Sequence, residues 1–168
     1  PMYIFTLFAA AKLGLIEVPI NTNFRATEIT YMVDKAEIST IVTDEDPEFL
    51  ANLSQVADNT TLLKNIVIDG VIDEEDERFQ VYSLEQMMTT AAKTDPAVEI
   101  KESDHFSILF TSGTTGLPKG AITTHKTAVL AAKSLASLPL DHESRNYNCL
   151  PLFHTNAQIY SALGVRCL

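Results

Sequence analysis

Apolar and polar positions recur along the 168 residues with two periods, one typical of helices and one typical of strands. A helical period covers residues 2–13 and stops at Gly14, a residue suited to the left-handed position after a helix. Further helices are predicted where a capping residue precedes an apolar stripe. They are expected after Thr27 with the stripe Ile29, Met32, Val33 and Ala36, after Asp46 and Pro47 with the stripe Phe49, Leu50, Leu53 and Val56, from Ser83 to about Ala92, and along Ala128, Val129, Ala132, Leu135 and Ala136.

Runs of β-branched and apolar residues predict strands between these helices. The predicted strands are LIEVPI at 15–20, ISTIVTD at 38–44, NIVID at 65–69, HFSILF at 105–110, AITTH at 121–125 and NYNCLPLF at 146–153. Strands that alternate with helices predict an α/β fold, in which parallel-rich sheets are flanked by helices.

A polar stretch at residues 93–103, which contains Pro96, predicts a linker. We therefore expect a first α/β sub-region at residues 1–92 and a second at residues 104–168. The chain begins within a helical pattern without an initiating methionine and ends within apolar residues. On this basis we expect it to be part of a longer protein.

The charge balance argues against one class of partner. The net charge is −10, with 46% hydrophobic and 20% charged residues, which is typical of a folded domain and unfavourable for binding DNA or RNA. Part of the negative charge lies in the run DEEDE at residues 73–77, which is interpreted as a solvated loop in preference to an acidic interaction surface. We expect no nucleic-acid partner.

The first apolar stretch is too short for a membrane span. Lys12 interrupts it after ten residues, whereas a span needs about 20 apolar residues, and no basic leader precedes it. Cys149 and Cys167 lack the CxxC spacing of a zinc site and are too few for a disulfide framework. These features predict a cytoplasmic protein without a transmembrane segment.

The most unusual segment is TSGTTGLPKGA at residues 111–121, with three glycines, four hydroxyl side chains and one lysine in an acidic protein. Glycines let the backbone approach a ligand closely, and successive N–H groups can form a nest for phosphate oxygens. The hydroxyl groups add donors, and Lys119 adds a positive charge. Together these groups predict a site for a polyphosphate.

The spacing of this loop excludes two common nucleotide motifs. Gly113 and Gly116 are too close for the Walker loop, Lys119 precedes Gly120, and G-x-G-x-x-G does not fit either. The loop is expected to join two strands, so a helix dipole does not contribute directly. A solvent-exposed hairpin turn is the alternative, although a plain turn does not need eleven residues in this order.

The segment LFTSGTTGLPKGAITTH resembles the signature loop of the adenylate-forming superfamily, which contains acyl-CoA synthetases, luciferases and peptide-synthetase adenylation domains. AAAKLGLIEVPINTNF resembles an upstream motif of that superfamily, and LPLFHTNAQ resembles a downstream motif. The three segments occur in family order, so the resemblance covers nearly the whole chain. It implies part of the large N-terminal domain of such an enzyme, without the C-terminal domain.

The resemblance implies an acid–CoA ligase that uses ATP, Mg²⁺ and coenzyme A with a small carboxylic acid, a fatty or acyl acid. Such an enzyme forms an acyl-adenylate and then a thioester. The implied contacts to the ATP phosphates are Thr111, Ser112, Gly113, Thr114, Thr115, Gly116 and Lys119. Thr111 is also implied to lie near Mg²⁺, and the family's carboxylate ligand for this ion is not found in the chain.

By the same resemblance, His154 borders the acyl pocket and the reacting carboxylate, and Lys119 and His154 are the implied catalytic residues. Asn156 and Ala157 are candidate pocket residues. The alternative for His154 is a histidine held by local hydrogen bonds, and the other histidines are interpreted as structural or exposed. They are His105, His125 and His142.

Two other functions stay open. One is an adenylation domain that loads a carrier protein, and the other is a non-catalytic truncated module that binds phosphate. Several downstream family motifs are absent from the 168 residues, so we expect the isolated chain to be inactive. The specific acid and the oligomeric state are not predicted.

Overall fold

The computed structural model describes residues 2–72, 76–111, 118–136, 143–145, 147–154 and 156–158. The elements are α1 (Met2–Lys12), α2 (Ala26–Ala36), β1 (Thr40–Asp44), α3 (Pro47–Ala57), β2 (Asn65–Asp69), β3 (Gln80–Ser83), α4 (Leu84–Thr90), β4 (His105–Thr111), β5 (Lys119–Thr124) and α5 (His125–Ala136). The chain forms two compact units. One is Ile20–Asp95, and the other combines Pro1–Pro19 with Pro96–Leu168.

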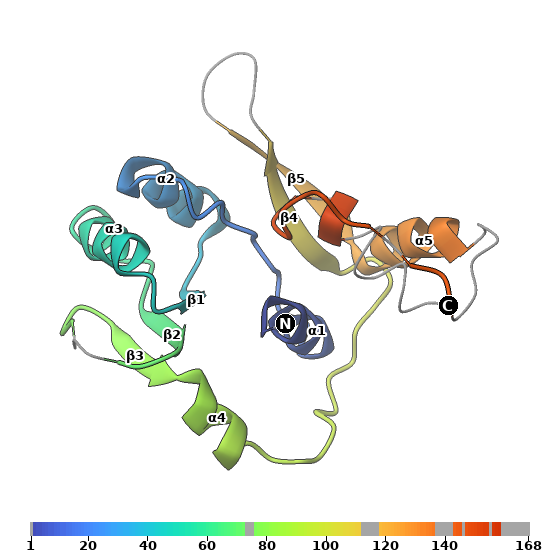
Figure 1. Cartoon of the computed structure of the whole chain (residues 1–168), viewed down its shortest axis with the longest axis horizontal. Helices are drawn as coiled ribbons and strands as arrows, with labels where there is room; N and C mark the ends of the chain where they lie inside the picture. The colour runs from blue at the N-terminus through green and yellow to red at the C-terminus, as the bar shows by residue number, and fades with distance from the viewer. Residues whose placement is uncertain are drawn as a thin grey trace. The chain divides into compact units, whose positions relative to one another are not determined.

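The unit Ile20–Asp95 is built on a parallel sheet in the order β1-β2-β3 (Figure 1). Ile41 pairs with Ile66 across the first ladder, and Ile66 pairs with Val81 across the second. Ile66 and Ile68 are buried on the face against which α2 and α3 pack. The predicted α/β fold with a parallel-rich sheet is therefore confirmed.

The apolar stripes of α2 and α3 form the core of this unit. The buried residues are Ile29, Met32 and Val33 in α2 and Phe49, Leu53 and Val56 in α3. Ala36 and Leu50, which complete the predicted stripes, are only half-buried. Both helices thus have the amphipathic form that their sequences predict.

One predicted helix cap is confirmed and another is wrong. The Asp46 carboxylate accepts a hydrogen bond from the Phe49 N–H at 2.8 Å, at the start of α3. Thr27 does not cap α2, because the capping position is Arg25. There the Glu28 carboxylate accepts from the Arg25 N–H at 3.1 Å, so an acidic side chain inside the first turn replaces the expected hydroxyl.

The capping-box segment that starts at Ser83 also behaves as predicted. The Ser83 hydroxyl accepts from the Gln86 N–H at 3.3 Å, and α4 ends at Thr90, two residues before the expected end. The strand β3 directly before it was not predicted. Its four residues are too short to show a period, and their pairing with β2 makes them a strand.

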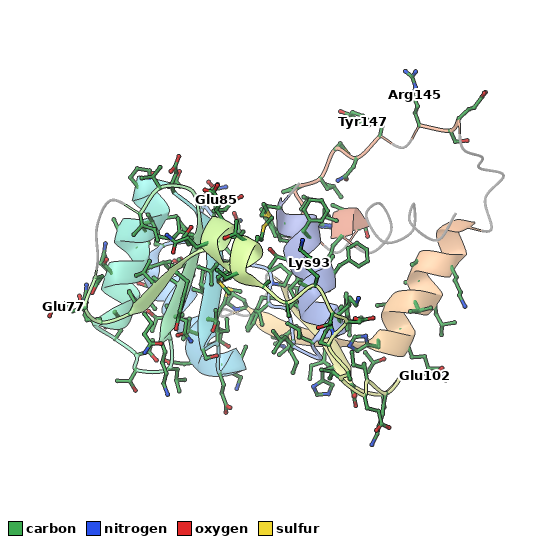
Figure 2. The ribbon with its side chains drawn as sticks, turned by 90° about the horizontal axis from the view of Figure 1, so that it is seen from below. Glu77, Glu85, Lys93, Glu102, Arg145 and Tyr147 are labelled. Carbon is green, nitrogen blue, oxygen red and sulfur yellow. The ribbon has the colours of Figure 1, made fainter. Side chains whose placement is uncertain are left out.

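Part of the acidic run is tied into an ion pair. Arg78 donates to both carboxylate oxygens of Asp76, at 2.8 and 2.6 Å, and the Ser54 hydroxyl donates at 3.1 Å. This pairing with Arg78 lowers the pKa of Asp76 to about 2. Glu77, the last residue of the acidic run, is exposed (Figure 2). Residues 73–75 lie outside the described residues.

The second unit contains the antiparallel pair β4–β5, and α5 follows β5 directly (Figure 1). Both predicted strands are confirmed, as is the expectation that the glycine-rich loop joins two strands. Leu7 of α1, Phe106 of β4 and Ala128 of α5 form a small buried cluster. Ala132 is also buried, whereas Val129 is 48% exposed, so the predicted apolar face of α5 is only partly covered.

Helix α1 ends at the predicted glycine. Gly14 has φ +68°, and the Leu15 N–H donates to the Ala10 carbonyl at 2.9 Å while the Gly14 N–H donates to the Ala11 carbonyl at 3.3 Å. This pair of hydrogen bonds is the Schellman arrangement, in which a left-handed residue closes the helix.

Among the described residues, no helix is long and apolar enough to cross a bilayer.

The predicted strand at 15–20 is wrong. Glu17 forms only an isolated parallel bridge to Ser107, in which its N–H donates to the Phe106 carbonyl and its carbonyl accepts from the Ile108 N–H. For the ladder with β4 to continue, the N–H of residue 19 would have to donate next, and this residue is Pro19. Because proline has no N–H, the ladder stops after one bridge.

The predicted strand at 146–153 is also wrong over the residues that the structure describes. Residues 147–149 are irregular, and a bend and a turn follow at residues 150–153. Tyr147 is 87% exposed and projects outward from the chain together with Arg145 (Figure 2). No strand pairs with residues 147–153 in the part of the chain that the structure describes, and a β-strand needs such a partner for its backbone groups.

The chain passes between the two units twice, once after Pro19 and once within the polar stretch 93–103. The N-terminal residues 1–19 join the later unit because Leu7 packs on Phe106 and the Glu17 backbone bonds to β4. The polar stretch after α4 contains the second boundary, between Asp95 and Pro96.

Replacing Asp46 with alanine should lower the free energy of unfolding by about 1 kcal/mol, because the Phe49 N–H loses its acceptor. Urea denaturation of the purified chain, followed by circular dichroism, measures the change. Asp69→Ala removes the same charge from an exposed position at the end of β2 and should stay within about 0.5 kcal/mol. Equal losses in the two variants would show that charge, and not the cap, sets the effect.

Candidate functional site

The two ends of the glycine-rich loop are held opposite each other by the β4–β5 ladder. Thr111 is the last residue of β4, Lys119 is the first of β5, and the two are register partners. The Thr111 hydroxyl donates to the Lys119 carbonyl at 3.5 Å, at the long limit for a hydrogen bond. Both residues are exposed, so the hydroxyl and the ammonium group share one end of the hairpin with access to solvent.

The remaining predicted phosphate contacts lie outside the described residues. These are Ser112, Gly113, Thr114, Thr115 and Gly116. Their roles stay predictions, whereas the strands that hold the loop are described.

Gly120 has a packing reason to be glycine. A Cβ placed there would lie 2.8 Å from Ile108 Cγ2 and 3.5 Å from Phe110 Cζ, on the neighbouring strand. The first distance is too short for two carbon atoms, and the branched isoleucine side chain has little freedom to turn away. Small size at this position therefore lets β5 pair with β4 directly beside Lys119.

His154 begins a short turn of helix. Its carbonyl accepts from the Gln158 N–H at 3.0 Å, and its Nδ1 accepts from the Asn156 N–H at 3.3 Å. A nitrogen that accepts carries no proton, so these contacts favour the tautomer with the proton on Nε2. His154 and Asn156 are exposed, whereas Ala157 is buried.

Of the three histidines interpreted as structural or exposed, two lie within the described residues. The His125 ring packs edge-on against Phe106, with ring centroids 5.3 Å apart, and His105 is exposed. His142 lies outside the described residues. The contact with Phe106 makes His125 part of the packing around β4.

A polar cluster of one buried and two half-buried residues lies in the same unit, and sequence reasoning missed it. The Tyr3 hydroxyl donates to Glu17 Oε1 at 2.7 Å, and Gln158 Nε2 donates to the Tyr3 oxygen at 3.1 Å and to Glu17 Oε2. Gln158 is fully buried. The available signals were Glu17 within the apolar run LIEVPI and Gln158 close after His154, since a charged residue in an apolar run is rarely buried unless paired.

Burial sets the electrostatics of this cluster. It raises the pKa of Glu17, and the hydrogen bonds from Tyr3 and Gln158 act in the opposite direction by favouring the carboxylate. Burial and the neighbouring Glu17 raise the pKa of Tyr3, which keeps its hydroxyl protonated and able to donate. In this cluster Gln158 only donates, Tyr3 both accepts and donates, and Glu17 only accepts, so the three hydrogen bonds are mutually compatible.

The part of the chain that the structure describes contains no group of three or more His, Cys, Asp or Glu side chains that could hold a metal ion. A hollow of about 310 Å³ lies in the other unit, lined by residues between Thr22 and Asn52, and none of the predicted site residues belongs to it.

Comparison with known proteins identifies the family. The sequence profile described as AMP-binding enzyme matches residues 1–167. The chain belongs to the AMP-binding enzyme family. The match extends over both compact units and includes the β4–β5 hairpin and the His154 segment.

Several CoA ligases are similar to this chain. The long-chain-fatty-acid–CoA ligase FadD13 of Mycobacterium tuberculosis is 33% identical over 162 residues, which cover 93% of this chain and 30% of the relative. The crotonobetaine/carnitine–CoA ligase of Salmonella agona is 30% identical over 166 residues, which cover 97% and 31%. The crystal structure of the anthranilate CoA ligase AuaEII with anthranoyl-AMP is similar with a TM-score of 0.84 and 26% identity, covering 97% of this chain and 31% of that one.

The chain therefore spans about 30% of the length of these AMP-binding relatives. Within that span the structure brings together the two predicted residues at the ends of the loop, Thr111 and Lys119. His154 and Asn156 lie together on a separate segment of the same unit.

Replacing Gly120 with alanine should destabilise the hairpin by about 1–3 kcal/mol, because the added methyl group overlaps Ile108. Urea denaturation measures the loss. In an Ile108→Ala background the obstructing methyl group is gone, so the same substitution should cost at least about 1 kcal/mol less. Additive losses in the double variant would contradict the steric explanation.

Proposed function

We propose that this chain contributes the phosphate-binding loop and part of the acyl site of an ATP-dependent acid–CoA ligase. The observation that carries the proposal is the register of β4 and β5, which holds Thr111 opposite Lys119 at the two ends of the loop. Membership of the AMP-binding enzyme family and the names of the CoA ligases similar to the chain support it. The proposal concerns the complete protein, since the chain spans about 30% of those relatives.

The proposed reaction activates a carboxylic acid in two steps. A carboxylate oxygen attacks the α-phosphorus of ATP, the bond from that phosphorus to the bridging oxygen breaks, and pyrophosphate leaves. The sulfur of coenzyme A then attacks the acyl carbon, AMP leaves with the electrons of the broken C–O bond, and the thiol proton passes to solvent. Charge accumulates on the departing pyrophosphate in the first step, and this is where electrostatic stabilisation contributes most.

The loop residues are proposed to hold the phosphates. Lys119 would place its ammonium group beside the pyrophosphate oxygens, and the Thr111 hydroxyl would donate from the opposite strand. Backbone and hydroxyl donors of the loop between them would complete the cradle, as proposed for Ser112, Gly113, Thr114, Thr115 and Gly116.

His154 is proposed to border the acyl pocket. Its exposed position and the tautomer favoured by the Asn156 contact leave an Nε2–H that can donate to a carboxylate oxygen of the acid. Such a donor orients the nucleophilic oxygen without removing its charge. Asn156 is exposed on the same turn and is proposed as a second contact to the acid.

Mg²⁺ is proposed only as the companion of ATP. Magnesium in such sites is held by carboxylates, water and substrate phosphates. The described residues offer the Thr111 hydroxyl without a group of acidic side chains, so by themselves they do not fit a magnesium site. No step of the reaction is assigned to the ion.

Replacing Lys119 with alanine in the complete protein should reduce acid-dependent ATP–pyrophosphate exchange about 10²-fold. The reason is that the departing pyrophosphate would lose the positive charge that stabilises it. Exchange is measured with a panel of aliphatic and aromatic carboxylic acids. Lys133→Ala removes the same charge from the last turn of α5 and should stay within about twofold of the unchanged protein. An unchanged rate for Lys119→Ala would contradict its role.

A second assay, of acyl transfer from the adenylate, separates the alternatives. Thioester formation with free coenzyme A supports the proposal, whereas acyl transfer only to a phosphopantetheine-bearing carrier protein identifies a carrier-loading domain. If no acid supports exchange by the complete protein, the ligase proposal is wrong and the non-catalytic alternative stands. The isolated 168 residues are expected to show no exchange.

A further inference from the structure

The segment that carries His154 is anchored by a buried side chain four residues further on. The Gln158 N–H donates to the His154 carbonyl at 3.0 Å, so the two residues belong to one turn. Gln158 has no exposed surface, in contrast to the exposed His154. Motion of the Gln158 side chain would therefore be passed directly to the backbone of His154.

The side chain of Gln158 is held by two residues from the start of the chain. Its Nε2 donates to the Tyr3 oxygen at 3.1 Å and to the Glu17 carboxylate, and Tyr3 donates to the same carboxylate at 2.7 Å. The three side chains form a closed triad, in which each is bonded to both of the others. Loss of both bonds of the Gln158 Nε2 would leave a buried donor without a partner, which is costly.

Glu17 joins this triad to the strand of the phosphate loop. Its N–H donates to the Phe106 carbonyl at 3.1 Å, and its carbonyl accepts from the Ile108 N–H at 2.8 Å. Both partners belong to β4, which continues to Thr111 at the start of the loop. A continuous path of hydrogen bonds and strand backbone thus connects His154 with Thr111.

We propose that Gln158 is a positioning residue, which fixes the His154 segment to the strand that carries the phosphate-binding loop. The catalytic consequence rests on the proposed function. The carboxylate held near His154 must meet the α-phosphorus of an ATP held by the loop, and a misplacement of about 1 Å between reacting groups can cost about 10²-fold in rate. Gln158 sets this spacing from outside the reacting groups.

The chemistry of the triad accounts for glutamine at position 158. An aliphatic side chain of similar size would fill the space, but it would remove the N–H group that donates to the Glu17 carboxylate. A glutamate would put two carboxylates in contact in a buried site, where like charges repel strongly. Glutamine supplies a neutral side chain whose N–H donors serve both Tyr3 and Glu17.

Gln158→Leu in the complete protein should lower kcat/KM for the acid at least tenfold, while KM for ATP stays within twofold because Lys119 and Thr111 are untouched. Hydrogen exchange measured by mass spectrometry should become faster in peptides that contain His154 and should not change in the unit Ile20–Asp95. Gln55→Leu replaces an exposed glutamine of α3 and should alter neither measurement.

An exchange of the two polar partners tests the pairing itself. Gln158→Glu alone should reduce activity at least tenfold, because it faces the carboxylate of Glu17. Combining it with Glu17→Gln restores one N–H donor against one carboxylate and should recover activity at least threefold over the single variant. This pair keeps the side-chain volumes nearly unchanged, so it serves if the leucine variant fails to fold.

The outcomes separate this inference from the proposed function. If the unchanged protein shows no acid-dependent pyrophosphate exchange but Gln158→Leu still loosens the His154 peptide selectively, the anchoring role holds and the ligase proposal falls. Unchanged hydrogen exchange around His154 would overturn the positioning role. So would a rise of more than twofold in KM for ATP, or a double exchange no better than Gln158→Glu.

Discussion

The strand β4 is the element on which the candidate site depends, because its backbone is bonded along both edges. On one edge it pairs antiparallel with β5, which sets Thr111 opposite Lys119 and closes the ends of the glycine-rich loop. On the other edge it bonds to Glu17, which brings the start of the chain into the same unit. β4 is thus paired with β5 on one edge and bridged at a single residue on the other, and both contacts fix the strand that leads to Thr111.

Under the proposed function, this arrangement links the two substrates of the first reaction step. The phosphates of ATP are proposed to bind at the end of β4, and the acid is proposed to bind beside His154. The triad of Tyr3, Glu17 and Gln158 connects the His154 turn to the residue that bonds β4. Family membership and the hairpin register support the activity of the complete protein, and the triad offers a physical reason why its two substrates would meet at a defined distance.

Local sequence signals predicted much of the fold. They failed where the structure of a segment depends on hydrogen bonds to residues far away in the sequence. The cap Asp46 and the stop at Gly14 act within one helical turn, so the sequence alone identified them. The apolar run at 15–20 reads as a strand, yet Pro19 removes the donor that a longer ladder needs. The phosphate-binding role of the loop was predicted from its glycines, hydroxyl groups and lysine and stays a prediction. The Gln158 anchor depends on bonds that span 141 and 155 residues, which no local pattern reports.

The most direct test of the adenylation chemistry follows a carboxylate oxygen. The complete protein is incubated with ATP, coenzyme A and an ¹⁸O-carboxylate acid that supports pyrophosphate exchange, and the products are examined by mass spectrometry. Attack of the carboxylate on the α-phosphorus transfers one ¹⁸O to AMP, so we expect singly labelled AMP in amounts equal to the thioester formed. Unlabelled AMP, or label in inorganic phosphate together with ADP, would contradict adenylation by this protein.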